Sequence, residues 1–136
     1  MTPPTDSPAA FVTKASPRSV DDTLRRVLHL VEQKGLTLFA VIDHSGEAHK
    51  VGLEMPATKL VVFGSPQAGT PVMLAAPLAA LDLPLKLLIW EDSAGAVSVS
   101  YDSPADVAAR HHLSADLRDR LAGIEALGDA TVAPQD

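Results

Sequence analysis

The chain has 136 residues, which is enough for one domain with a substantial core, and its 46% hydrophobic content excludes a mainly disordered protein. With 17 acidic against 11 basic residues and a net charge of −6, it lacks the clustered Lys and Arg of a surface that binds nucleic acid or an anionic membrane. The chain contains no cysteine, which excludes disulfides, thiolate nucleophiles and cysteine-ligated zinc.

Both ends of the chain are predicted to lie outside the folded domain. Residues 1–8 carry three prolines and little to bury, so we expect a disordered N-terminal tail. The domain should span residues 9–128, and residues 129–136 should form a disordered C-terminal tail. The N-terminus lacks the features of a signal peptide, and no apolar run approaches the roughly 18 residues of a membrane span. We therefore expect a cytoplasmic protein.

The first predicted elements are a strand and a long amphipathic helix. Residues 10–15 alternate weakly and should form a strand that ends at Ser16-Pro17. Ser19 is a suitable N-cap for a helix over residues 20–34, and Gly35 is suitable for its C-terminal cap. The spacing places one apolar stripe on this helix: Val20, Leu24, Val27, Leu28 and Val31.

Residues 36–42 are apolar on both alternate faces, which predicts a strand in the interior of a sheet. The polar stretch 45–52 fits either a short helix or an extended loop, and a third strand should cover residues 59–63. Thr70 and Pro71 then predict a helix that extends to residue 81 and is kinked by Pro77. Because this helix is apolar around its circumference, it must be covered by the domain or by a partner subunit.

A hairpin of residues 85–90 and 96–101 should follow, with a turn that contains Gly95. Its second strand alternates between apolar and polar residues, so one face of the sheet should be covered and the other should meet water. Helices should begin at Ser103 and at Ser114, the second with the stripe Leu117, Leu121, Ile124 and Leu127. The fold class is therefore a single α+β domain with an antiparallel sheet of about five strands and helices packed on one face.

Polar residues follow the ends of the predicted strands and form the candidate site. The candidate ligand-binding residues are Asp43, His44, Glu54, Glu91 and Asp92, and Asp82 could join them at one rim of the sheet. Carboxylates and an imidazole at close quarters could hold a divalent metal or exchange protons. The alternative is that these residues cap turns and hydrogen-bond the backbone, since their spacing matches no specific catalytic or metal motif.

Three other features favour ordinary structural roles. The segment 64–70 has two glycines between a strand and a helix but lacks the Lys of a phosphate-binding loop. Trp90 and Tyr101 could stack a planar ligand, although buried aromatic residues usually serve packing. His111 and His112, next to Arg110, are expected at a solvated helix end.

Several short motifs are spread over most of residues 11–112: Gly35-Leu36-Thr37-Leu38-Phe39, Ile42-Asp43-His44, Pro56-Ala57-Thr58, Phe63-Gly64-Ser65-Pro66 with Gly69-Thr70, and Asp82-Leu83-Pro84-Leu85-Lys86 with Trp90-Glu91-Asp92. Together these motifs resemble the domain of unknown function 302 family, a group of small bacterial and archaeal domains. Ser65 and Val72 depart from the pattern, in which an Asn and a longer side chain are commoner.

The resemblance implies an antiparallel sheet with helices on one face, similar to the TATA-binding-protein architecture (β-α-β4-α), and a tendency to form homodimers. It implies no established reaction and no cofactor. We therefore expect a homodimeric, non-catalytic domain that binds a small ligand or a partner, without nucleic acid or membrane. The alternatives are a metal- or carboxylate-dependent enzyme that uses His44 with Glu91 or Asp92, and a purely structural or regulatory dimer.

Overall fold

A computed structural model describes residues 11–134 of the chain, so the predicted tail at residues 1–8 lies outside the described residues. The strands are β1 (Phe11–Ala15), β2 (Thr37–Asp43), β3 (Thr58–Gly64), β4 (Leu85–Glu91) and β5 (Val97–Asp102). The helices are α1 (Val20–Gln33), α2 (His44–Lys50), α3 (Pro66–Ala75), α4 (Pro104–His111), α5 (Ala115–Asp119) and α6 (Gly123–Val132), with a 3-10 helix, η1 (Pro77–Leu81), after α3.

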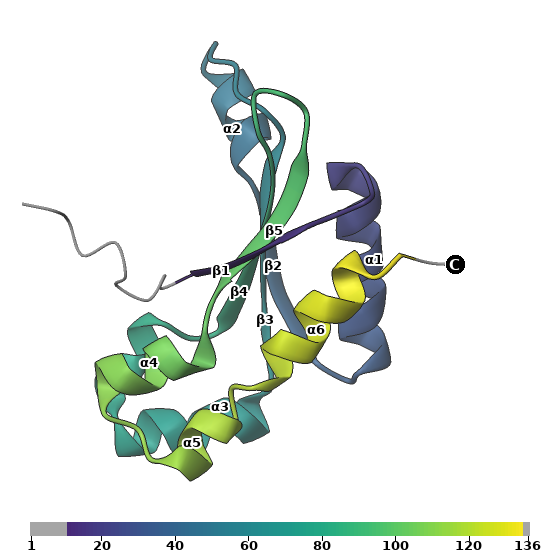
Figure 1. Cartoon of the computed structure of the whole chain (residues 1–136). Helices are drawn as coiled ribbons and strands as arrows, with labels where there is room; N and C mark the ends of the chain where they lie inside the picture. The colour runs from purple at the N-terminus through teal and green to yellow at the C-terminus, as the bar shows by residue number, and fades with distance from the viewer. Residues whose placement is uncertain (1–10, 135–136) are drawn as a thin grey trace, which may run out of the picture.

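The five strands form one antiparallel sheet in the order β1-β5-β4-β3-β2. Helices α1 and α6 pack against each other on one face, α1 over β2, β3 and β4, and α6 over β1 and β5 (Figure 1). The shorter helices α3, α4 and α5 gather at one end of the sheet (Figure 1). The predicted α+β fold, with an antiparallel sheet and helices on one face, is confirmed.

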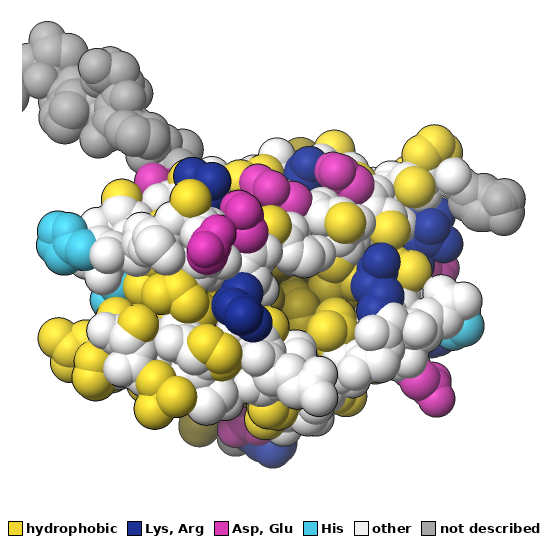
Figure 2. Space-filling view, turned by 90° about the horizontal axis from the view of Figure 1, so that it is seen from below, with side chains coloured by type: hydrophobic (Ala, Val, Ile, Leu, Met, Phe, Trp, Pro, Cys, Tyr) yellow, Lys and Arg dark blue, Asp and Glu magenta, His cyan; other side chains and the backbone are white. Residues whose placement is uncertain are grey.

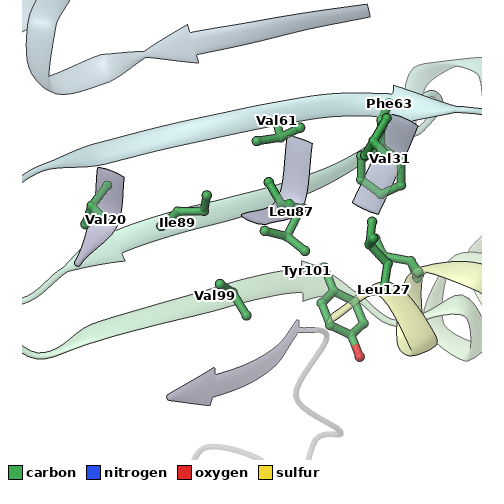
Figure 3. Packing of buried hydrophobic residues seen from close by; sticks show 11 residues of the cluster. Val20, Val31, Val61, Phe63, Leu87, Ile89, Val99, Tyr101 and Leu127 are labelled. Carbon is green, nitrogen blue, oxygen red and sulfur yellow. The ribbon is translucent and has the colours of Figure 1, made fainter. Parts of the chain in front are cut away.

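The main core lies between the sheet and these two helices. Alternate residues of the three inner strands face the helices, as their period of two requires: Val61, Phe63, Leu87, Ile89, Val99 and Tyr101 (Figure 3). Val20 and Val31 of α1 and Leu127 of α6 meet them from above the sheet (Figure 3). Ser19 caps α1 by accepting a hydrogen bond from the Asp22 N–H at 3.0 Å, so the predicted start of this helix is confirmed.

A smaller core connects the helices at the end of the sheet. Val72 of α3, Ala79 of η1, Val107 of α4 and Leu121 are buried together. The stripe predicted for one long final helix is divided between α5 and α6, which are separated at residues 120–122. Residues 44–50 form the helix α2, which resolves the two alternatives for that stretch.

The prediction that residues 36–42 form an interior strand is wrong, because β2 lies at an edge of the sheet. Leu38, Phe39, Val41 and Ile42 are between 38% and 51% exposed. An apolar run indicates that a strand is covered, but it does not say whether its own domain or another chain covers it.

Helix α3 begins at Pro66, before the start that Thr70 and Pro71 predicted. Ser65 caps it instead, with its Oγ 3.3 Å from the Ala68 N–H, and Pro66 occupies the first turn. The helix ends at Ala75, and Pro77 starts the separate η1. Val72 and Ala79 are buried, but Leu74, Leu78 and Leu81 are exposed, so only one side of this region is covered.

The prediction of a disordered tail from residue 129 is also wrong for residues 129–132, because α6 continues to Val132. Thr131 is fully buried, and two arginines of the α1 region bind the last carbonyls of α6. Arg18 donates to the carbonyl oxygens of Thr131 and Ala133 at 2.9 and 2.6 Å, and Arg26 Nε donates to Ala130 O at 2.7 Å. These bonds satisfy carbonyls that a helix end leaves without a partner. The sequence of residues 129–134 alone does not reveal them, because the donors lie in and just before α1.

Gly128 provides a test of the α6 packing, because a Cβ atom there would lie 2.7 Å from Tyr101 Cε2. Gly128→Ala should lower the free energy of unfolding by about 1–3 kcal/mol, since the buried ring must shift. Chemical denaturation measures this change. Gly123→Ala is the matched control, because a Cβ there meets nothing within 4 Å, and its stability should equal or exceed that of the wild type. Equal stability of the two variants would contradict the packing.

Candidate functional site

Strands β2 and β4 each pair antiparallel with β3 and therefore end on the same side of the sheet, which places Asp43 and Glu91 along one rim. Asp43 ends β2 and accepts hydrogen bonds from the Gly46 N–H at 2.9 Å and the Ser45 hydroxyl at 2.8 Å. These bonds hold the pKa of Asp43 below its ordinary value. Asp43 thus acts as the N-cap of α2, the role that the alternative interpretation assigned to it.

The other predicted site residues lie near this rim without converging. Asp92 accepts hydrogen bonds at 2.9 Å from the backbone N–H groups of Ala94 and Ala96, which closes the β4–β5 turn. Glu54 contacts His49 at 3.0 Å on the surface. The side chains of His44 and Glu91 form no hydrogen bond or ion pair with another residue of the described chain. Within residues 11–134, no three His, Asp or Glu side chains are arranged to hold a metal ion.

Asp82 lies at the opposite end of the sheet, because it precedes β4 while Glu91 ends it. There it joins a group that we call the Asp82 cluster: Asp82, Asp102, Arg110 and His111. Arg110 Nη1 donates to Asp82 Oδ2 at 2.8 Å and to Asp102 Oδ2 at 3.1 Å. His111 Nε2 donates to Asp82 Oδ2 at 2.5 Å, and its side chain is only 10% exposed. The expectation of a solvated His111 is therefore wrong.

Local structure explains how the cluster forms. Asp82 is the C-cap of η1, and Asp102 ends β5. Ser103 caps α4, and His112 ends it in the left-handed conformation with φ 55°, which places Arg110 and His111 in the last turn. Cations are favourable at this end of a helix, and α4 packs against η1, which brings the carboxylate of Asp82 to them.

The two carboxylates of the cluster differ in their hydrogen bonding. Burial alone would raise the pKa of Asp82, but the hydrogen bonds from His111 and Arg110, together with their charges, outweigh it and lower the pKa. Asp102 Oδ1, in contrast, is buried and has no hydrogen-bond partner among the described residues. A buried carboxylate oxygen without a donor is costly, so this atom is suited to accept a hydrogen bond from a ligand.

A cavity of about 590 Å³ adjoins the cluster, and we call it the sheet-face cavity. Asp82, Asp102 and Arg110 line it at one end. Its apolar walls include side chains from three strands, β1, β3 and β4, on the face opposite α1 and α6: Phe11, Leu60, Leu88 and Trp90. None of the described helices covers the middle of this face (Figure 1). The volume lies within the range of roughly 300–1,000 Å³ that is typical of ligand pockets.

Hydrogen bonds hold the polar part of this face in place. Ser100 Oγ accepts from Trp90 Nε1 at 3.0 Å and contacts Thr13 Oγ1 at 2.8 Å, which links β1, β5 and β4. Trp90 therefore presents its ring on the exposed face and is not a residue of the main core. A fixed aromatic ring near an unbonded carboxylate oxygen can bind a ligand that has both a planar or apolar body and a donor group.

The family model described as "Domain of unknown function DUF302" matches residues 12–128. The chain belongs to the DUF302 family. The crystal structure of an uncharacterized conserved protein DUF302 from Bacillus stearothermophilus superposes with a TM-score of 0.75, covers 90% of this chain and 95% of that chain, and is 18% identical. At that identity the likeness shows the shared DUF302 fold alone.

Curated relatives of this DUF302 chain include the fluoride-specific ion channel FluC 1 of Brucella suis and that of Brucella abortus. Each is 39% identical over 105 residues, which is 77% of this chain. The match covers 41% and 39% of those proteins, so the chain corresponds to about two fifths of their length. Among the described helices, none has both the length and the apolar character needed to cross a bilayer.

The Asp82 cluster provides a pH-dependent test. Because the folded pKa of Asp82 is lowered, its interactions stabilise the fold above the ordinary pKa of 3.8 and are lost as the pH falls through the folded value. Asp82→Asn should cost about 1 kcal/mol of stability at neutral pH and make the acid side of the pH–stability curve less steep. Denaturant unfolding across pH measures both effects.

Asp119→Asn is the control for this experiment, since Asp119 is 67% exposed and its nearest cation, Arg118, lies at 3.4 Å. Its pH–stability curve should match that of the wild type. An Asp82→Asn curve that also matches the wild type would contradict the role of the cluster.

Proposed function

We propose that this DUF302 domain is a homodimer that binds a small ligand in the sheet-face cavity. The observation that carries the proposal is that Asp102, which lines a cavity of about 590 Å³, has a buried carboxylate oxygen, Oδ1, without a donor among residues 11–134. The ligand supplies the missing donor, such as an amine, amide or hydroxyl group, and its apolar or planar body lies along Trp90 and Leu88.

The remaining groups of the site support recognition. Arg110 holds Asp102 through Oδ2, which leaves Oδ1 to the ligand, and His111 and Arg110 together hold Asp82. Arg110 and His111 already have carboxylate partners, whereas the carboxylate oxygen Asp102 Oδ1 has no donor among the described residues. This favours a neutral or cationic ligand over an anionic one at this position.

The proposed dimer forms through the edge strand β2. Strands at a sheet edge present unpaired backbone groups, and natural proteins usually protect them with charged residues or proline. Residues 37–42 contain neither, and Leu38, Phe39, Val41 and Ile42 are exposed. Pairing of β2 with its symmetry mate would cover these groups and leave the sheet-face cavity open, because that cavity lies over β1, β5, β4 and β3.

The similarity to the Brucella fluoride channels supports a second candidate, a domain that accompanies an ion channel and responds to its ion. Sodium fluoride and sodium chloride at equal ionic strength distinguish this candidate from the first. A melting temperature raised by fluoride alone would favour it.

The binding site is tested with Asp102→Asn. An Asn side chain keeps its carbonyl oxygen toward Arg110 and places an NH₂ group where Oδ1 stood, so a ligand donor meets another donor. In a thermal-shift panel of amines, hydroxylated and aromatic metabolites, divalent metals and fluoride, a compound should raise the melting temperature of the wild type and have little effect on Asp102→Asn.

His44→Ala is the matched variant for this panel, since His44 belongs to the rim site that the sequence suggested. It should respond to the same compound as the wild type does. If His44→Ala loses the response while Asp102→Asn keeps it, the ligand binds at the rim with His44, Glu91 or Asp92, and the sheet-face assignment is wrong.

The dimer is tested with Val41→Lys, which places a charge on the proposed interface at a residue that is 39% exposed. Light scattering at micromolar concentration should give a dimeric mass for the wild type and a monomeric mass for the variant, because an unpaired charge in an interface is strongly unfavourable. Leu74→Lys, at an 80% exposed position of α3, should stay dimeric. A monomeric wild type, or dissociation by Leu74→Lys alone, would contradict the β2 interface.

A further inference from the structure

A second cavity, of about 350 Å³, lies where α3 begins and where α5 is followed by α6. Its walls are mainly aromatic and aliphatic: Phe39, Phe63, Met73, Leu83, Leu121 and Ile124. Figure 2 views this end of the molecule and shows a hollow that has hydrophobic side chains on its floor and basic side chains beside it. We call this hollow the apolar end cavity, and it shares only Leu85 and Ile124 with the sheet-face cavity.

Glycines keep the apolar end cavity open. Gly64, Gly69 and Gly123 all line it and contribute no side chain. A Cβ at Gly123 would meet nothing within 4 Å, and a Cβ at Gly69 would meet only Leu83, at an ordinary contact distance of 3.8 Å. A larger residue at Gly69 would therefore extend beside Leu83, a wall of the cavity, without a clash at its first atom.

Among residues 11–134, Arg120 is the only charged residue that lines this cavity, and its side chain is exposed. Its guanidinium forms no hydrogen bond or ion pair with another residue of the described chain, whereas the neighbouring Arg118 contacts Asp119 at 3.4 Å. The first residues of α3, Pro66 and Ala68, also line the cavity, and the start of a helix is favourable for negative charge. An unpaired cation thus stands at the edge of an apolar hollow in a chain of net charge −6.

We propose that the apolar end cavity binds an amphipathic monocarboxylate, with its alkyl or aryl body among the apolar walls and its carboxylate on Arg120. A guanidinium donates to both oxygens of a carboxylate, which an alcohol or an amine of the same length cannot reproduce. The cavity lies at the small end of the range for ligand pockets, which suits one short hydrocarbon chain. This inference does not depend on the ligand proposed for the sheet-face cavity.

Octanoate, below its micellar concentration, is the probe for this site, and 1-octanol and octylamine are its neutral and cationic counterparts. Isothermal titration of the full chain should show octanoate binding more tightly than 1-octanol, and octylamine binding least. Arg120→Gln should weaken octanoate binding by about tenfold or more, as expected for the loss of a charge-assisted contact, and should leave 1-octanol unchanged. Arg118→Gln, the matched control, should bind octanoate as the wild type does.

Gly69→Leu adds a side chain beside Leu83 in the apolar end cavity and should weaken binding of both octanoate and 1-octanol, with its fold checked by circular dichroism. Asp102→Asn should still bind octanoate, which separates this site from the sheet-face cavity. The proposal is overturned if the folded wild type binds no octanoate. It is also overturned if octanoate and 1-octanol bind equally and Arg120→Gln changes neither, because the anion would then have no role.

Discussion

Two helices from opposite ends of the chain, α1 and α6, share one face of the sheet, and the rest of the architecture depends on this packing. Arg18 and Arg26 join them by binding the final carbonyls of α6, so the C-terminal helix completes the core. Because both long helices occupy the same face, the opposite face keeps Trp90, Leu88 and Leu60 at the wall of a cavity. The sheet-face cavity is therefore a consequence of a sheet that is covered on one side.

The sequence predicted the parts of the fold that local patterns determine. Alternation in residues 96–101 predicted one covered face, which in β5 holds Val99 and Tyr101, and the cap at Ser19 located the start of α1. The sequence did not predict that β2 lies at the edge of the sheet. An apolar strand is expected to be covered, but its composition does not show whether the same domain or another chain covers it. The sequence analysis also ended the domain too early, since the hydrogen bonds that hold α6 come from arginines more than a hundred residues away.

The candidate site shows the same division between local and distant information. Capping by Asp43 and Asp92 depends on residues two to four positions away, and the sequence offered that role as an alternative. The Asp82 cluster joins residues 28 positions apart and requires the contact between η1 and α4. The only sequence signal for this cluster was that Asp82 and Arg110 carry opposite charges and lie at the ends of predicted elements. Charged residues are common at element ends, so this signal does not identify a pair. The DUF302 resemblance defined the fold and the family without a residue role.

Trp90 allows the most direct test of the sheet-face site, because it is the only tryptophan in the chain and lines that cavity. Its indole N–H, which donates to Ser100 Oγ at 3.0 Å, gives a single resolved proton–nitrogen signal in a nuclear magnetic resonance spectrum. During titration with a compound that stabilises the wild type, this signal should move in step with the backbone signals of Asp102 and Ser100. A stabilising compound that leaves the Trp90 signal unchanged and moves the signals of His44 and Glu91 would contradict the account.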